Sequence, residues 1–151
     1  MWPIDYWNLM DQKQREIARK FTLDLQSVLG VQLIEFSLKH EWQRTPPEDA
    51  GDQSLDDYML KAYMWYDDYH AFDDFQEVFW AKHQRAPYLT PPTREAWDSC
   101  KIISKASGDE AARRVHIFRT WFHSTFFVDG QPLFILPLEN VAPRYRDDPP
   151  E

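Results

Sequence analysis

Three side chains near the middle of the chain have the types and spacing of metal ligands. His70, Asp74 and Glu77 are separated by four and then three residues, so a helix would place them on one side. Imidazole and carboxylate groups that converge from one side of a helix commonly bind divalent metals. A two-metal helical bundle would also need Glu-x-x-His pairs on other helices, which the chain does not supply at that spacing. We therefore keep a metal site at these residues as a minor alternative to a solvated helix face, and we expect no cofactor.

Two other groups of reactive side chains have simpler explanations. His116 and His123 share a helix face with Arg119 and could bind an anion or assist proton transfer, but such sets more often form a mixed polar surface. Cys100 is the single cysteine, which excludes an internal disulfide and a Cys-based zinc site, and its place in a helix favours the core. No nucleophile elbow, phosphate-binding loop, dinucleotide fingerprint or zincin motif occurs. The sequence therefore does not favour an enzyme.

The clearest signal is a segment that is both acidic and aromatic. From Glu48 to Glu77 the chain has ten carboxylates and a single base, Lys61, whereas the net charge of the whole chain is −8. Nine of the 24 aromatic residues lie between Tyr58 and Trp80. Such a segment repels nucleic acid, attracts basic surfaces, and offers large rings as interface anchors. We expect the partner-binding residues to be Asp67, Tyr69, His70, Asp73, Asp74, Glu77 and Trp80.

These features favour a protein-binding protein. The leading hypothesis is an inhibitor of the immunity, antitoxin or phage-encoded type that blocks a basic, nucleic-acid-acting protein, with no direct contact to nucleic acid or membrane. Two alternatives stay open: a helical assembly subunit that self-associates through Trp65, Tyr69 or Trp80, and a small enzyme or ligand-binding protein with an aromatic pocket. In the least specific interpretation, the acidic segment pairs with the eight bases found between residues 79 and 128.

The composition and the N-terminal sequence predict a cytoplasmic protein. MWPIDYWNLM lacks the basic start and apolar run of a signal peptide, and no apolar run approaches the ~20 residues needed to cross a bilayer. A single cysteine fits a reducing compartment.

Proline spacing predicts a mainly α fold. Three long stretches, 4–45, 48–86 and 93–131, contain no proline, and the four glycines are too few for the turns of a β-sandwich. We expect a single-domain bundle of about five to six helices over residues 1–142, and a loose tail over residues 143–151.

In the first third of the chain, one helix is clear and the next element is ambiguous. The first helix should begin near Asp5 or Asp11 and end before Gly30. Its predicted inward stripe is Met10, Ile17, Phe21, Leu25 and Val28. Residues 31–42 fit both a strand, extended near 31–38, and a short helix, which we favour. Residues 43–53 should form an exposed loop.

The acidic aromatic segment should form two helices. Ser54 is a good N-cap residue. The apolar face of 55–66 points about 140° away from that of 65–83, so one straight helix would not bury both against one core. These faces are Leu55, Met59, Ala62 and Tyr66, and then Trp65, Phe72, Phe75, Phe79 and His83. We predict a break near Tyr66–Asp68, with Asp67 or Asp68 capping the second helix.

Two further helices and an extended segment should complete the fold. One helix runs from Thr93 to Gly108 with Ala96, Cys100 and Ile103 inward, and the last is capped by Asp109. The inward stripe of the last helix is Ala111, Val115, Phe118, Phe122 and Phe126. The β-forming residues 115–128, followed by Asp129-Gly130, also suggest a hairpin, but the helical stripe is cleaner. Residues 133–136, within 133–138, should form a short strand or an extended segment over the core.

Overall fold

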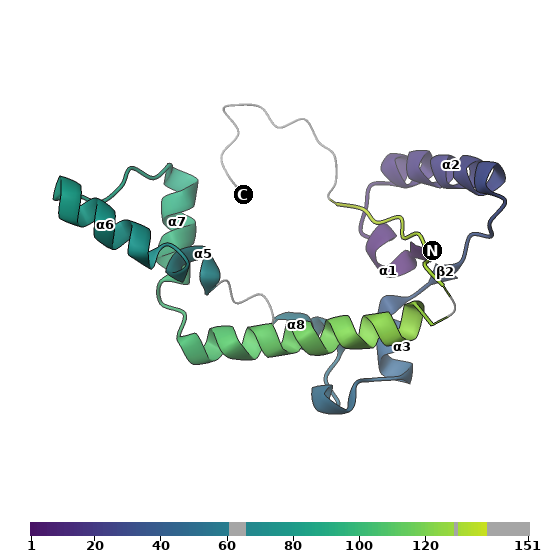
Figure 1. Ribbon diagram of the computed structural model, residues 1–151. Coiled ribbons are helices and arrows are strands. Elements are labelled where there is room, and N and C mark those ends of the chain that lie inside the picture. The colour runs from purple at the N-terminus through teal and green to yellow at the C-terminus, as the bar shows by residue number, and fades with distance from the viewer. Residues whose placement is uncertain (61–65, 129, 139–151) are drawn as a thin grey trace. The chain divides into compact units, whose positions relative to one another are not determined.

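The computed structural model describes residues 1–60, 66–128 and 130–138, and it confirms a mainly helical fold with a short β segment (Figure 1). In chain order its elements are β1 (Trp2–Pro3), α1 (Ile4–Trp7), α2 (Gln12–Leu29), β2 (Glu35–Phe36), α3 (Leu38–Arg44), the 3-10 helix η1 (Glu48–Ala50), α4 (Leu55–Leu60), α5 (Asp67–His70), α6 (Asp73–His83), α7 (Pro91–Cys100) and α8 (Lys105–Phe126).

The chain divides into two compact units. Among the described residues, unit 1 contains 1–56 together with the chain from residue 119 onward, and unit 2 contains the chain between 57 and 118. Helix α8 supplies residues to both units. The expected single domain over 1–142 stays a prediction, and the expected tail over 143–151 lies outside the described residues.

Local signals set both ends of α2, as predicted. The carboxylate of Asp11 accepts hydrogen bonds from the backbone N–H groups of Lys13 (2.9 Å) and Gln14 (3.2 Å), which is a side-chain N-cap. At the other end Gly30 takes a left-handed conformation with a φ of 65°, which glycine adopts without a steric penalty.

The predicted inward face of α2 is wrong. Ile17, Phe21 and Val28 are 63%, 60% and 82% exposed, whereas Thr22 is buried. Polar contacts hold one side of α2 against the rest of unit 1. Gln26 accepts a hydrogen bond from the backbone N–H of Leu33, and Arg19 pairs with Glu35.

The ambiguous segment after Gly30 forms a short strand followed by a helix. Strand β2 pairs in parallel with β1, with Trp2 opposite Glu35 and Pro3 opposite Phe36. Ser37 then caps α3, because its hydroxyl accepts from the backbone N–H of His40 at 3.0 Å. Both interpretations were therefore partly right.

The buried centre of unit 1 is aromatic. Trp42 and Trp121 meet edge to face with ring centroids 4.9 Å apart, and each indole donates to a backbone carbonyl, of Gln53 and Thr45 respectively. Residues 133–136 are extended, as expected, and lie beside the N-terminal residues. The backbone N–H of Ile135 donates to the carbonyl of Met1, and its own carbonyl accepts from the Trp7 indole.

The loop expected over residues 43–53 is shorter and partly buried. Helix α3 extends to Arg44, and η1 occupies Glu48–Ala50. Ala50 is buried.

In unit 2 the predicted boundary between the last two helices is wrong. Thr90, not Thr93, occupies the N-cap position of α7, because Pro91 and Pro92 fit the first helical turn, and the helix ends at Cys100. Helix α8 begins at Lys105 and continues through Gly108.

Gly108 lies inside helix α8, where it allows Tyr66 to come close, and it does not end a helix. An added Cβ at this position would lie 2.6 Å from the Cβ of Tyr66, so only glycine lets the two segments come this near. Since Gly108 is inside α8, Asp109 cannot cap the helix as predicted. The hydroxyl of Ser104 instead accepts from the backbone N–H of Ser107 at 3.2 Å.

Residues 115–126 are helical, so the hairpin interpretation is excluded. The buried side of α8 matches the expected stripe only in part, with Phe118, Phe122 and Phe126 half-buried. Ala111 is buried as predicted, but Val115 is 45% exposed, and Arg114 and Trp121 take the inward positions. The possible turn at 129–130 includes Asp129, which lies outside the described residues.

Candidate functional site

The acidic aromatic segment forms two short helices that are joined by a turn. Helix α5 carries Asp67, Tyr69 and His70, and α6 carries Asp73, Asp74, Glu77 and Trp80. A helix begins at Asp67, inside the predicted break, while residues 61–65 lie outside the described part. A second break, not predicted, falls at Ala71–Phe72.

The predicted aspartate caps are wrong. Tyr66 and Phe72 occupy the N-cap positions of α5 and α6, and neither forms a side-chain capping hydrogen bond. The aspartates follow in the first turns, where negative charge is favourable to the helix dipole. Their carboxylates are therefore not used as caps.

Three of the expected partner-binding residues, Tyr69, His70 and Asp73, are engaged within unit 2. Tyr69 meets Trp97 edge to face at 5.4 Å, and the His70 ring stacks on Tyr66 at 4.1 Å. His70 Nδ1 also lies 3.2 Å from the carboxylate of Asp73. Tyr69 and His70 are half-buried, and their direct contact with a partner stays a prediction.

The remaining carboxylates are exposed and have no ion pair with any described residue. They are Asp67, Asp68, Asp74 and Glu77.

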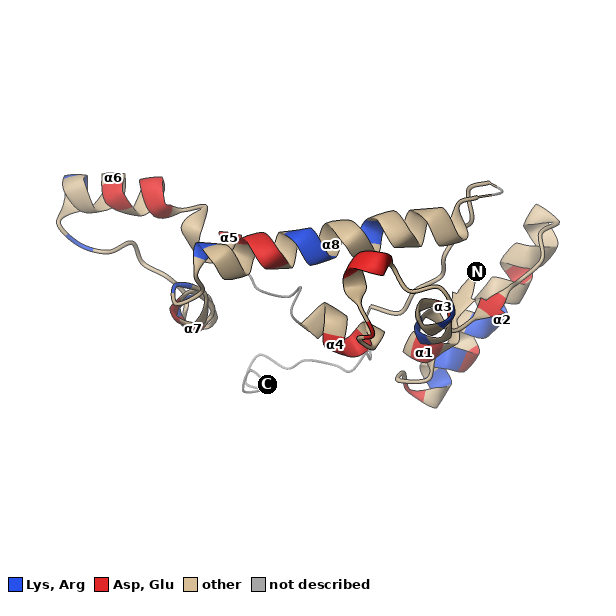
Figure 2. Ribbon diagram, turned by 90° about the horizontal axis from the view of Figure 1, so that it is seen from below, with Lys and Arg blue, Asp and Glu red and all other residues tan. Residues whose placement is uncertain are grey.

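Several bases of residues 79–128 are already paired with acids of their own helices. Lys101 pairs with Asp98, Lys105 with Asp109, and both Arg113 and Arg114 with Glu110. The described contacts thus do not support neutralisation of the acidic segment by these bases, although Lys39 pairs with Asp56 at 2.5 Å. Figure 2 shows acidic residues in the first part of α6 and basic residues at its end.

Helix α6 has no buried residue although it contains large apolar side chains. Phe75, Val78 and Trp80 are 50%, 68% and 56% exposed. Glu77 and Trp80 are three residues apart, and Asp74 and Val78 are four apart, so each acid neighbours an apolar side chain on the helix surface. Val78 was missed because it lies outside the expected apolar stripe. We define the acidic aromatic surface as Asp67, Asp68, Asp74, Phe75, Glu77, Val78 and Trp80.

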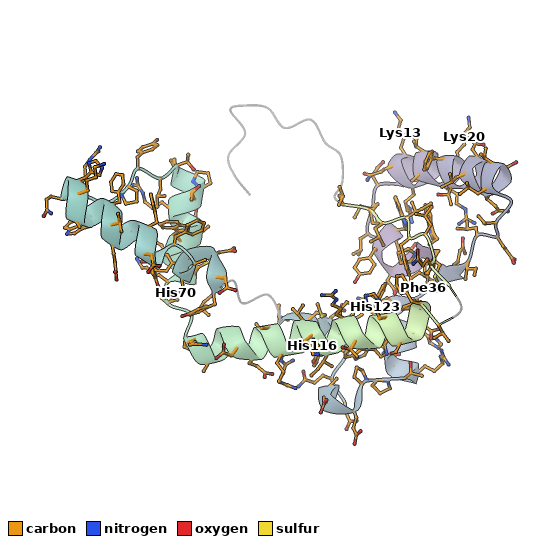
Figure 3. The ribbon with its side chains drawn as sticks, viewed as in Figure 1. Lys13, Lys20, Phe36, His70, His116 and His123 are labelled. Carbon is orange, nitrogen blue, oxygen red and sulfur yellow. The ribbon has the colours of Figure 1, made fainter. Side chains whose placement is uncertain are left out.

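The alternative sites have little structural support. Within the described ranges no group of three or more His, Cys, Asp or Glu side chains could hold a metal, so His70, Asp74 and Glu77 do not form one. Figure 3 shows that His70 belongs to α5. His116, Arg119 and His123 are exposed on α8, as a polar surface would be.

Cys100 is buried, as predicted for a core residue. Burial raises the pKa of its thiol, and the negative charge of Asp68 adds to this effect. A raised pKa keeps the sulfur protonated near neutral pH, which is unfavourable for a nucleophile.

Unit 1 contains an apolar cavity of about 370 Å³. It is lined by α2, the segment 31–34 and the segment 131–135. None of its lining residues is aromatic, so it is not the aromatic pocket that an enzyme or ligand-binding protein was expected to have.

Comparison of the chain with known protein families, with curated proteins and with solved structures finds no match. In the described part of the chain, no helix has the length and apolarity required to cross a membrane.

Proposed function

We propose that this chain is a protein-binding protein whose acidic aromatic surface binds a partner with a basic surface. One observation carries the proposal: α6 exposes Phe75, Val78 and Trp80 beside the carboxylates Asp74 and Glu77, which have no ion pair with described residues. Exposed rings supply contact area, and unpaired acids supply charge complementarity.

The physical basis is the instability of such a helix in isolation. Helices shorter than ~12–15 residues are marginal in water and gain most of their stability from packing an apolar face. Helix α6 has 11 residues and buries none of them fully. A partner that covers Phe75 and Val78, which lie about 60° apart on α6, would provide the missing burial, at roughly 25 cal/mol for each Å² of apolar surface removed from water.

In its more specific form, the proposal is an inhibitor of the immunity or antitoxin type. A basic protein that acts on nucleic acid presents lysines and arginines to phosphates, and a rigid set of carboxylates can occupy the same positions. The net charge of −8 opposes binding to nucleic acid itself. Because the single cysteine fits a reducing compartment, the partner should be sought first among cytoplasmic proteins.

The test is affinity capture from the native host with the full chain, at low and then high salt. We expect a basic protein to be retained at low salt and released as salt screens the contact. The test variant combines Asp67→Asn, Asp68→Asn, Asp74→Asn and Glu77→Gln. The control variant makes the same change in net charge at other exposed acids: Glu48→Gln, Asp49→Asn, Asp52→Asn and Glu95→Gln.

Trp80→Ala provides a second test that leaves the charge unchanged. Trp80 is 56% exposed, so its truncation should not unfold unit 2, but the loss of an interface anchor should weaken binding by about 2 kcal/mol. Binding that survives both Trp80→Ala and the four substitutions on the surface would refute the proposal. Equal loss in the control variant would show that only net charge matters, which would also refute it.

A further inference from the structure

Helix α2 presents a second exposed face that combines apolar and basic side chains. At 100° per residue, Lys13, Ile17, Lys20, Phe21 and Val28 lie within about 100° of one another. The three apolar members are more than half exposed. Figure 3 shows Lys13 and Lys20 projecting from α2 away from α1. We call these five residues the basic apolar face.

The lysines of this face are available for a contact. Neither Lys13 nor Lys20 forms an ion pair with a described residue, whereas Arg19 is paired with Glu35 and lies over the ring of Trp2. Asp24 lies on the same side of the helix, but α2 as a whole has four bases against two acids. Its surroundings are therefore basic, in contrast to those of the acidic aromatic surface.

We propose that the basic apolar face binds the acidic aromatic surface of a second copy of this chain. The inference rests on the proposed function, because it names a partner for that surface. The two surfaces have opposite charge, and each places large apolar side chains next to its charged groups. Lys13 and Lys20 are two helical turns apart, and the acids also form two groups, one on α5 and one on α6.

Each surface leaves apolar side chains exposed to water and charged groups without an ion pair among the described residues. Ile17, Phe21 and Val28 lose contact with water only if another surface covers them, and Phe75 and Val78 of the other copy, about 60° apart on α6, supply an apolar one. The lysines would then meet carboxylates that are unpaired in the described chain. Because the contact joins two different surfaces, the copies would associate head to tail, as a closed ring or as an open chain.

Self-association would also regulate the surface that binds the basic partner. A copy whose acidic aromatic surface is covered by α2 of another copy cannot bind a second protein there. Each surface offers only a few large apolar side chains, so we expect weak association that a tighter partner would displace.

The first measurement is sedimentation velocity of the full chain from low micromolar to several hundred micromolar. We expect the mean mass to rise with concentration at low salt and to return to that of one chain at high salt. A chain that remains monomeric at every concentration in low salt would overturn the proposal. The same result is expected if the basic apolar face is covered by another part of its own chain.

Charge reversal then tests which surfaces meet. Lys13→Glu with Lys20→Glu, or Asp74→Lys with Glu77→Lys, should each weaken association at least about tenfold by placing like charges opposite one another. Mixing the two variants should restore association, because the charges become complementary again. If each variant loses association and the mixture does not recover it, the proposed pairing is wrong.

Matched controls separate this contact from general charge effects and from the proposed function. Arg94→Glu with Arg119→Glu makes the same change in net charge at exposed residues of other helices, and it should leave the mass unchanged. Equal loss in this control would overturn the inference. Suppose that Lys13→Glu with Lys20→Glu leaves the mean mass equal to that of the unsubstituted chain, while Asp74→Lys with Glu77→Lys no longer captures a host protein. In that case the proposed self-association is wrong and the proposed function stands.

Discussion

Replacing Arg114 by methionine should destabilise unit 2 far more than the same change at its neighbour. Arg114 is 8% exposed, and its guanidinium donates to the carbonyl of Tyr58 at 3.1 Å and lies 4.7 Å from the centroid of the Tyr58 ring. Its Nε is also 2.7 Å from a carboxylate oxygen of Glu110. The methionine side chain keeps most of the volume and removes all three interactions.

The magnitude follows from what remains after the substitution. A buried carbonyl left without a hydrogen-bond partner costs about 1–3 kcal/mol, and a lost cation–π contact adds about 1–2 kcal/mol. Glu110 is 42% exposed and keeps Arg113, so its charge is not left buried and alone. We therefore expect a loss of roughly 2–4 kcal/mol, or a fall in Tm of roughly 5–15 °C for a chain of this size.

Arg113→Met is the matched control for this experiment. Arg113 pairs with the same carboxylate at 2.7 Å, but its side chain is 48% exposed, and such surface pairs contribute about 0–1 kcal/mol. Denaturant unfolding and hydrogen exchange of residues 105–118 would compare the two variants. Equal destabilisation by both substitutions would refute the argument that burial determines the cost.

Three further predictions concern unit 2. The hydrogen bond from Arg113, together with that from Arg114, lowers the pKa of Glu110 from its ordinary 4.5 to about 2. Its stabilising effect is therefore complete above pH 4.5 and is lost as the pH falls toward 2, so Glu110→Gln should reduce the acid dependence of unfolding measured between these values. Gly108→Ala, which would stabilise an ordinary exposed helix by about 1 kcal/mol, should here cost about 1–3 kcal/mol by crowding Tyr66. A second substitution, Tyr66→Gly, which takes away the Cβ that the new side chain would meet, should remove the clash, as thermal melting would show. Native Cys100 should react with a thiol reagent much more slowly than in denaturant, since the side chain is buried and its thiol pKa is raised; equal labelling rates would contradict this.

Much of the secondary structure could be predicted because it depends on nearby residues. Asp11 and Gly30 set the ends of α2 through a side-chain cap and a left-handed backbone, and both signals lie within a few residues of the groups that they satisfy. The start of a helix at Asp67 agrees with a shift in the apolar face that is visible in the sequence alone, whereas the break at Ala71–Phe72 was not predicted. The acidic aromatic segment was recognised for the same reason, since its charges and rings are close together in the chain, but its role in binding a partner stays a prediction.

The tertiary structure decided which side of each helix is buried. The apolar stripe of α2 has clear periodicity, yet Thr22 is inside and Phe21 is outside, because Gln26 and Arg19 bond to residues 33–35 on the opposite side. Position 108 within α8 requires glycine because Tyr66, 42 residues earlier, occupies the space that a side chain would need. Periodicity determines that a helix has a face, but contacts between residues distant in the chain determine where that face points, and the local sequence does not encode those contacts.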